Sequence, residues 1–166
     1  TTGVRSRAVF PGSTGRTISS YREFTQHFPE PGWVEHDALE IWDAVRATLH
    51  DVIDQVGTPA AIGITNQRET VLAWNRRTGQ PYGNAIVWQD RRTAGRCDQL
   101  AAEGHLPQVR AVTGLVLDPY FSATKMRWLL DHVPGARARA VRGDAVFGTI
   151  DTFLVHRLTG GAAHVT

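Results

Sequence analysis

Apolar residues recur at helical spacing between residues 37 and 56, which makes this the clearest amphipathic segment of the chain. The apolar positions of one face are Trp42, Val45, Leu49, Val52, Ile53 and Val56. Asp37 can cap the N-terminus, and Glu40 fits the second half of a capping box. The Gly-Thr-Pro sequence at 57–59 ends the pattern. We therefore predict a helix over 37–56 with one buried face.

Shorter apolar runs bounded by turn residues predict strands. A Pro-Gly-Ser-Thr cluster at 11–14 separates residues 6–10 from residues 15–20, which predicts a hairpin whose second strand extends toward residue 26. Further strands are expected at 60–64, 71–74, 84–88 and 146–148. The sheet is therefore built first from a hairpin and then from strands spread along the chain.

Helical patterns alternate with the later strands, at 91–103, 106–113, 122–132 and 151–158. In the segment 122–132, Ser122 is the expected N-cap. The side chains expected to face inward from this segment are Met126, Leu129, Leu130 and Val133. Together these patterns predict an α/β fold, with a mixed sheet and flanking helices.

The most informative polar residues follow the expected strand at 60–64. Here Arg68 offers guanidinium donors and Glu69 offers a carboxylate acceptor, a combination that suits a small ligand rich in hydroxyls. A surface ion pair of little energetic value is the competing interpretation. The position at a strand end, where α/β proteins place ligands, favours the ligand site.

Two aromatic residues are further candidates: the ring of Trp88 could form an apolar wall beside such a ligand, and Tyr120 could donate a hydroxyl into the pocket. Trp88 ends the expected strand at 84–88 and is followed by charged residues that fit a helix start with Asp90 as N-cap. Tyr120 lies in the Asp-Pro-Tyr-Phe-Ser sequence at 118–122. A turn leading into the cap explains that sequence as well as a ligand-binding hydroxyl does.

Composition narrows the functional classes. The formal net charge of +2 is too small to favour binding to nucleic acid or to a membrane surface. Cys97 is the single cysteine, which excludes an internal disulfide and a cysteine-based metal site. The seven histidines lack metal-binding spacing, and no apolar run is long enough to span a bilayer. We therefore expect a cytoplasmic protein with no bound metal among these histidines. Because the sequence begins without Met and both ends look cut, we also expect a fragment.

Long motifs that cover almost the whole chain resemble the FGGY family of carbohydrate kinases. In order, they lie at 31–37, 62–70, 84–93, 113–115 with 118–122, and 148–152. The Gln-Arg-Glu-Thr and Asp-Pro-Tyr-Phe-Ser sequences match the branch of the family that acts on glycerol. The resemblance implies the actin-like, ribonuclease H-like ATPase fold. It also implies that residues 1–166 are a partial N-terminal domain, without its first strand, its end or the C-terminal domain.

The same resemblance implies ATP-dependent phosphorylation of glycerol to glycerol 3-phosphate, with Mg²⁺, by a homo-oligomeric parent enzyme. Carried over by position, Arg68, Glu69 and Tyr120 would hydrogen-bond the glycerol hydroxyls, and Trp88 would pack against the glycerol carbons. Such a site would reject a substrate that lacks those hydroxyls, because its polar groups would be left unpaired.

The beginning of the chain resembles the end of the phosphate loop of the family. Thr1 and Thr2 match the last residues of this loop, and Gly3 stands where a hydroxyl residue is usual. Arg5 aligns with the phosphate-contacting arginine, whereas a two-residue insertion would assign that role to Arg7. We prefer Arg5, because hairpins resist insertions near a ligand loop.

The resemblance places the catalytic Asp and the Asp that organises Mg²⁺ outside residues 1–166. We therefore predict no catalytic or metal-binding residue in the chain and no kinase activity of the isolated chain. Two alternatives stay open at this point. The parent could be an FGGY kinase for a pentulose, a hexonate or another polyol, or the chain could be a truncated remnant without catalysis.

Overall fold

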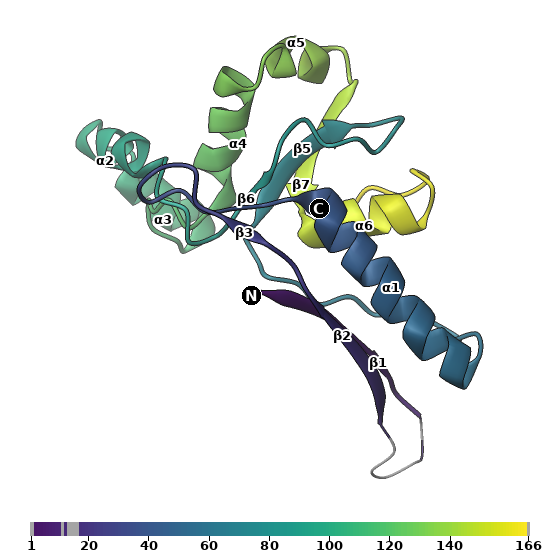
Figure 1. Cartoon of the computed structure of the whole chain (residues 1–166). Coiled ribbons are helices and arrows are strands. Elements are labelled where there is room, and N and C mark those ends of the chain that lie inside the picture. The colour runs from purple at the N-terminus through teal and green to yellow at the C-terminus, as the bar shows by residue number, and fades with distance from the viewer. Residues whose placement is uncertain (1, 11, 13–16, 166) are drawn as a thin grey trace.

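The computed structural model describes residues 2–10, 12 and 17–165 (Figure 1). The strands are β1 (Gly3–Ala8), β2 (Ile18–Glu23), β3 (Gln26–His27), β4 (Glu35–His36), β5 (Val71–Asn75), β6 (Ala85–Ile86) and β7 (Ala145–Thr149). The helices are α1 (Ala38–Val56), α2 (Ala94–Ala102), α3 (Leu106–Thr113), α4 (Ser122–His132), α5 (Ala136–Val141) and α6 (Ile150–Leu158). The α/β architecture agrees with the prediction.

Strands β1 and β2 form the predicted hairpin, with Gly3 opposite Glu23 and Ala8 opposite Ile18. The other strands form a sheet in the order β3-β4-β6-β5-β7, and neighbouring strands run antiparallel. Val71 of β5 pairs with Ile86 of β6. Because β5 and β6 are antiparallel, the beginning of β5 and the end of β6 lie at the same edge of the sheet.

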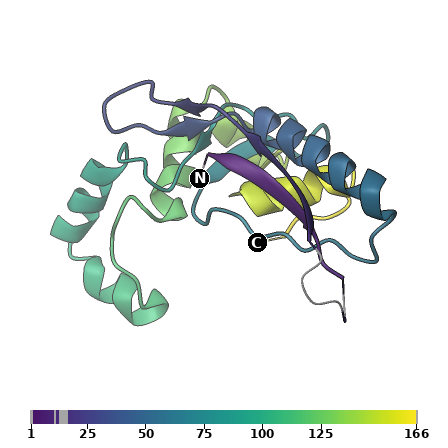
Figure 2. The same ribbon diagram turned by 60° about the horizontal axis from the view of Figure 1, so that its bottom comes forward.

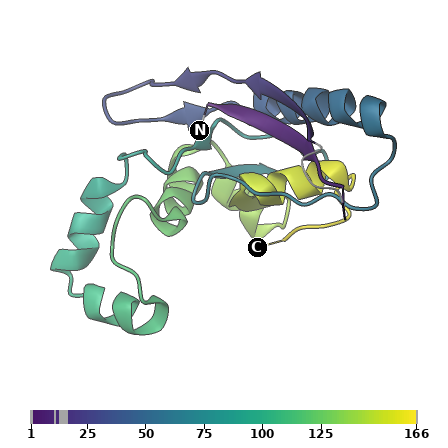
Figure 3. The same ribbon diagram turned by 90° about the horizontal axis from the view of Figure 1, so that it is seen from below.

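Helices cover both faces of β5, whose residues Val71–Trp74 are all buried. Leu72 and Trp74 join a core with residues of α1 and α6, among them Ile41 and Phe153. The alternate residues of β5 join Leu129 of α4 in a second core. Figures 2 and 3 show that α2 and α3 project from the side of the domain opposite α1. The strand β5 is thus the centre of a layered body.

Helix α1 agrees closely with the predicted segment. The Asp37 carboxylate accepts the backbone N–H of Leu39 at 2.8 Å, which confirms the cap. The capping box is wrong, because the Glu40 carboxylate instead accepts both the N–H and the hydroxyl of Thr25 at 3.0 Å. The buried residues of α1 are Ala38, Ile41, Ala44, Val45, Thr48 and Val52. Of the predicted apolar face, only Val45 and Val52 are fully buried, and the other members lie at its margin.

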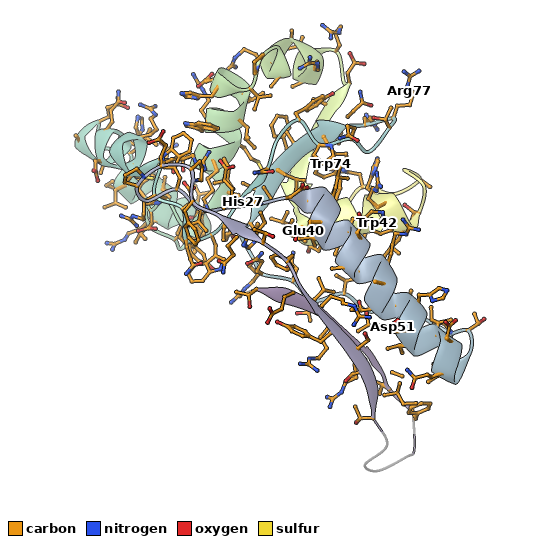
Figure 4. All side chains as sticks on the ribbon, viewed as in Figure 1. His27, Glu40, Trp42, Asp51, Trp74 and Arg77 are labelled. Atoms are coloured by element: carbon orange, nitrogen blue, oxygen red, sulfur yellow. The ribbon has the colours of Figure 1, made fainter. Side chains whose placement is uncertain are left out.

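Polar contacts attach the hairpin to α1. The hydroxyls of Ser6 and Thr48 lie 2.8 Å apart. Further along, Asp51 accepts the Ser20 hydroxyl at 2.6 Å and pairs with Arg22 at 2.7 Å. In Figure 4, Trp42 and Asp51 lie along α1, and Arg77 lies at the tip of the loop after β5.

The predicted strand at 60–64 is wrong. Its residues have no regular secondary structure, and Ile62 and Ile64 are 49% and 37% exposed. The segment lies along a groove of about 960 Å³ that is also lined by β1, α1 and α6. No described strand pairs with it. Without a hydrogen-bonding neighbour, an apolar run stays an extended segment rather than a strand.

The expected helix at 91–103 begins later, at Ala94, because the charged residues before it form a buried network. Asp90 is not the N-cap of α2. Its buried carboxylate accepts the N–H of Val34 at 2.7 Å and binds the Arg92 guanidinium at 2.8 and 2.9 Å. That guanidinium lies 3.8 Å from the ring centre of Trp33. These charges hold the segment before β4 against the end of β6.

Candidate functional site

Three segments meet beside the edge of the sheet where β5 begins and β6 ends. Thr70, just before β5, accepts the N–H of Trp88 at 3.3 Å. Glu69, the preceding residue, is hydrogen-bonded to Ser122 at the start of α4. We call Glu69, Trp88, Tyr120, Ser122 and Lys125 the candidate site. The antiparallel register of β5 and β6 brings together residues that are far apart in the sequence.

Glu69 has a φ of 62°, and it is the one non-glycine residue with positive φ among those that the structure describes. Such a conformation is costly for a residue of this size and is retained where surrounding contacts enforce it. Here the backbone turns sharply into β5. The turn places the Glu69 carboxylate at the N-terminus of α4.

The Glu69 carboxylate is bound at that helix terminus through one oxygen. Oε2 accepts the backbone N–H of Ser122 at 2.8 Å and its hydroxyl at 2.6 Å. The first amides of a helix lack intrahelical acceptors and favour negative charge. Ser122 was predicted as the N-cap, but Phe121 holds that position and Ser122 binds Glu69 instead. Oε1 has no hydrogen-bond partner in the described part of the chain, so it can accept a ligand hydroxyl.

Lys125 lies beneath these contacts and is completely buried. Its ammonium donates to the backbone carbonyl of Glu69 at 3.2 Å and to that of Tyr120 at 2.9 Å. Burial lowers the pKa of Lys125 to about 8, although the nearby carboxylates of Asp90 and Glu69 oppose the shift. The sequence prediction missed this residue. Its signal was compositional, since Lys125 is the only lysine of the chain.

Trp88 and Tyr120 form one aromatic wall. Their ring centres lie 5.9 Å apart at an angle of 64°, and both side chains are half-buried. The Tyr120 backbone N–H donates to Asp118 at 2.7 Å, which confirms the turn predicted at 118–122. The Tyr120 hydroxyl makes no hydrogen bond to any other described residue. The aromatic wall therefore offers an apolar surface together with a hydroxyl that a ligand can use.

Arg68 is the predicted ligand residue that the structure does not bring into these contacts. Its side chain is exposed and forms no hydrogen bond or ion pair with other described residues. The competing interpretation, an ion pair between Arg68 and Glu69, is therefore wrong. The role of Arg68 toward a ligand stays a prediction.

The residues expected to contact phosphate lie at the start of β1, except for Thr1, which is outside the described residues. Thr2 is exposed. Gly3 lies so close to Tyr21 that a Cβ there would be 2.4 Å from the tyrosine oxygen and 2.6 Å from the carbonyl oxygen of Arg22. Only glycine fits this position without movement. Arg5 is exposed and lies 5.0 Å from the ring centre of Tyr21.

Within the described ranges, the chain has neither a cluster of metal ligands nor a helix that could cross a membrane. No group of three or more His, Cys, Asp or Glu residues is placed to hold a metal ion there. In the same part of the chain, every helix is too short or too polar to span a bilayer.

Residues 1–166 match the sequence model of the FGGY family of carbohydrate kinases, N-terminal domain. A glycerol kinase of Roseobacter denitrificans is 56% identical over an alignment of 166 residues, with 97% of this chain and 34% of that protein covered. A glycerol kinase of Myxococcus xanthus is 55% identical over 174 residues, with 96% of this chain and 35% of that protein covered. The chain thus spans about a third of the length of these curated relatives.

Solved structures agree with the sequence match. A glycerol kinase of Plasmodium falciparum, solved with ADP, superposes with a TM-score of 0.82 at 36% identity, covering 86% of this chain and 29% of that one. A xylulose kinase of Lactobacillus acidophilus superposes with a TM-score of 0.79 at 21% identity, covering 95% of this chain and 31% of that one. The second likeness shows the fold alone. The predicted actin-like fold class is confirmed.

Proposed function

Because this chain belongs to the FGGY family of carbohydrate kinases, we propose that it supplies the glycerol-binding wall of an ATP-dependent glycerol kinase. The reaction would transfer the γ-phosphoryl group of ATP to a terminal hydroxyl of glycerol and give sn-glycerol 3-phosphate. The observation that carries the proposal is the Glu69 carboxylate. It is fixed at the start of α4 through Oε2, with Oε1 left for a hydroxyl.

Each residue of the wall has a role that follows from its chemistry. Glu69 accepts a hydrogen bond from a glycerol hydroxyl, and the Tyr120 hydroxyl either donates or accepts one. Arg68 donates from its guanidinium. The ring of Trp88 covers the carbon atoms of the substrate. A ligand without hydroxyls would leave these polar groups unpaired and would bind weakly.

On the phosphate side, we propose that Thr1, Thr2, Gly3 and Arg5 contact the nucleotide. ATP is the proposed phosphoryl donor and Mg²⁺ the proposed cofactor, which would neutralise charge on the phosphates. No group of three or more His, Cys, Asp or Glu residues among those described could hold a metal ion, and we assign none of them to Mg²⁺. Phosphoryl transfer depends on positioning the acceptor and the donor together, and the described residues supply the acceptor half.

Activity requires a longer protein, because the chain covers 34% of its Roseobacter denitrificans relative. The test is therefore a chimeric kinase in which residues 1–166 replace the matching part of that relative. We expect ATP-dependent phosphorylation of glycerol by the chimeric kinase and none by the isolated chain. Faster turnover of xylulose or erythritol than of glycerol would contradict the proposed substrate. Activity of the isolated chain would contradict the proposal that residues 1–166 supply only the glycerol-binding half of the enzyme.

The variant Glu69→Gln tests the carboxylate itself. It keeps the size of the side chain but removes the charge, so kcat/KM for glycerol should fall about 10- to 100-fold. The matched control is Glu103→Gln, which makes the same change at an exposed residue after α2. We expect the control to leave kcat/KM unchanged. Equal kinetics of the two variants would remove Glu69 from the site.

A further inference from the structure

Lys125 holds two parts of the candidate site at once. Its ammonium is fully buried in α4, one helical turn after Ser122. It donates to the backbone carbonyls of Glu69 and Tyr120 at 3.2 and 2.9 Å, two residues that lie far apart in the sequence. These are the two residues whose side chains carry the proposed hydrogen bonds to the substrate. Lys125 is also the single lysine of the chain.

Both carbonyls accept a hydrogen bond from the same buried ammonium. Removing a donor from a carbonyl that water does not reach destabilises the folded state, so these two hydrogen bonds hold each carbonyl toward Nζ. For Glu69 the constraint has a particular effect, because its backbone has a φ of 62°. The carbonyl is held by Lys125 and the carboxylate by Ser122, so α4 fixes this residue through its backbone and its side chain.

Charges from several elements surround the ammonium. The carboxylates of Asp90, Glu69 and Asp118 favour the protonated form of Lys125, and the Arg92 guanidinium opposes it. Asp90 and Arg92 belong to the segment between β6 and α2, and Asp118 precedes α4. A neutral apolar side chain in place of Lys125 would remove the ammonium that both carbonyls accept from. Asp90 would still be paired with Arg92 and Asp118 with Arg91, whereas Glu69 would lose its nearby cation.

We propose that Lys125 is a positioning residue that fixes Glu69 and Tyr120 relative to each other and thereby sets the affinity for glycerol without touching it. The proposal rests on the proposed function of the site. A purely structural lysine would stabilise α4 but would leave the affinity of the folded protein for glycerol unchanged. The two roles can therefore be separated by measuring affinity and stability in the same variants.

The experiment compares three variants of the chimeric kinase. Lys125→Met removes the donor at similar length, and Lys125→Arg keeps a cationic donor. Leu129→Ala, the matched control, opens a cavity in the same helix at a buried residue outside the site. Thermal unfolding, steady-state kinetics and calorimetric titration with glycerol are measured for each. The KM for ATP serves as an internal reference.

For Lys125→Met we expect a KM for glycerol raised about 10- to 100-fold, with a matching loss of calorimetric affinity and the KM for ATP within about twofold. Lys125→Arg should recover a large part of that loss. Leu129→Ala should lower Tm and leave the KM for glycerol unchanged. If Lys125→Met does not fold, Lys125→Gln takes its place, with a raised KM for glycerol as the supporting result and an unchanged KM as the contradicting one.

The proposal is overturned if folded Lys125→Met, or Lys125→Gln in its place, binds glycerol as the unmodified chimeric kinase does, or if Leu129→Ala raises the KM for glycerol equally. Failure of the proposed function gives a different result. In that case the unmodified chimeric kinase neither binds nor phosphorylates glycerol, before any substitution at Lys125 is made.

Discussion

The strand β5 and the segment 60–64 both consist of apolar residues, yet they lie in different environments. Each residue of Val71–Trp74 is buried, whereas Ile62 and Ile64 are 49% and 37% exposed. β5 has a paired strand at each edge and helices on both faces. The segment 60–64 lies along a groove and pairs with no described strand. Apolar content is therefore not sufficient for burial, and paired neighbours decide the outcome.

The two sides of the proposed site, one for the substrate and one for the phosphate, also differ in how far an apolar core supports them. The substrate side, with Glu69 and Tyr120, lies against β5 and α4, where an apolar core supports it. The phosphate side, with Arg5, lies on the hairpin, which polar contacts such as the one between Ser6 and Thr48 attach to α1. We therefore expect substitutions on the sheet side to affect stability more than substitutions in the hairpin.

The largest expected difference is between Trp74→Ala and Ser6→Ala. Trp74, labelled in Figure 4, is completely buried. Its ring centre lies 5.5 Å from that of Phe153, so its loss should cost about 3–5 kcal/mol. Ser6→Ala removes one hydrogen bond to Thr48 and should cost about 1 kcal/mol. Thermal unfolding of both variants of the chimeric kinase checks the difference. Equal losses of stability would mean that the hairpin is held as firmly as the sheet.

His36 predicts a pH dependence of stability at the junction of the two sides. It is completely buried, its Nδ1 lies 2.9 Å from the Gln67 amide nitrogen, and its ring packs edge-on against Phe24. Burial and nearby positive charge lower its pKa from 6.5 to about 4. Between these two values the unfolded chain binds a proton that the folded chain excludes. Stability contributed by neutral His36 is therefore complete above pH 6.5 and is lost as the pH falls toward 4.

The expected loss between pH 7 and pH 4.5 is about 2–3 kcal/mol from this residue. His36→Gln removes the titrating group, so its stability should fall less steeply over the same range. Thermal unfolding of both proteins at pH 7, 5.5 and 4.5 measures the two slopes. Identical slopes would show that His36 is protonated to the same extent in the folded and unfolded states.

Some of the helices and caps that depend on neighbouring residues in the sequence were predicted correctly. The helices over 106–113 and 122–132 have the predicted bounds, and Asp37 caps α1 as expected. Glu40 and Ser122 were assigned by the same capping rules but bind residues of other elements. A capping motif identifies side chains that can accept or donate a hydrogen bond near a helix end. The tertiary fold determines which partner each of these side chains binds. The strand predicted at 60–64 failed for the related reason that pairing is a long-range property.

The candidate site was predicted in part. Glu69, Trp88 and Tyr120 were chosen from strand ends and a turn, and the structure brings them together through the pairing of β5 with β6. Their roles toward glycerol came from the resemblance and not from the pattern. Lys125 could not be predicted in this way, because a lysine in a helix is usually exposed. Its burial follows only from the packing of α4 against the start of β5.

The smallest expected effect concerns the hairpin, where the sequence left two arginines as candidates for the phosphate contact. Arg5 and Arg7 alternate with Ser6 along β1, so both lie on the exposed face, opposite the face that contacts α1. Arg5 is closer to Gly3 by two residues, and its guanidinium is held 5.0 Å from the ring centre of Tyr21. This contact keeps the Arg5 side chain near the start of the strand. Arg7 lies two positions further along β1, nearer the end of the strand.

Arg5→Ala in the chimeric kinase should therefore raise the KM for ATP about tenfold, the effect of losing one charge-assisted hydrogen bond at an exposed site. Arg7→Ala, the matched control on the same face, should change it less than about twofold. Neither substitution should alter the KM for glycerol, because Glu69 and Tyr120 are supported by β5 and α4. A larger effect of Arg7→Ala would assign the phosphate contact to Arg7. A change in the KM for glycerol with either variant would mean that the two sides of the site are coupled through the hairpin.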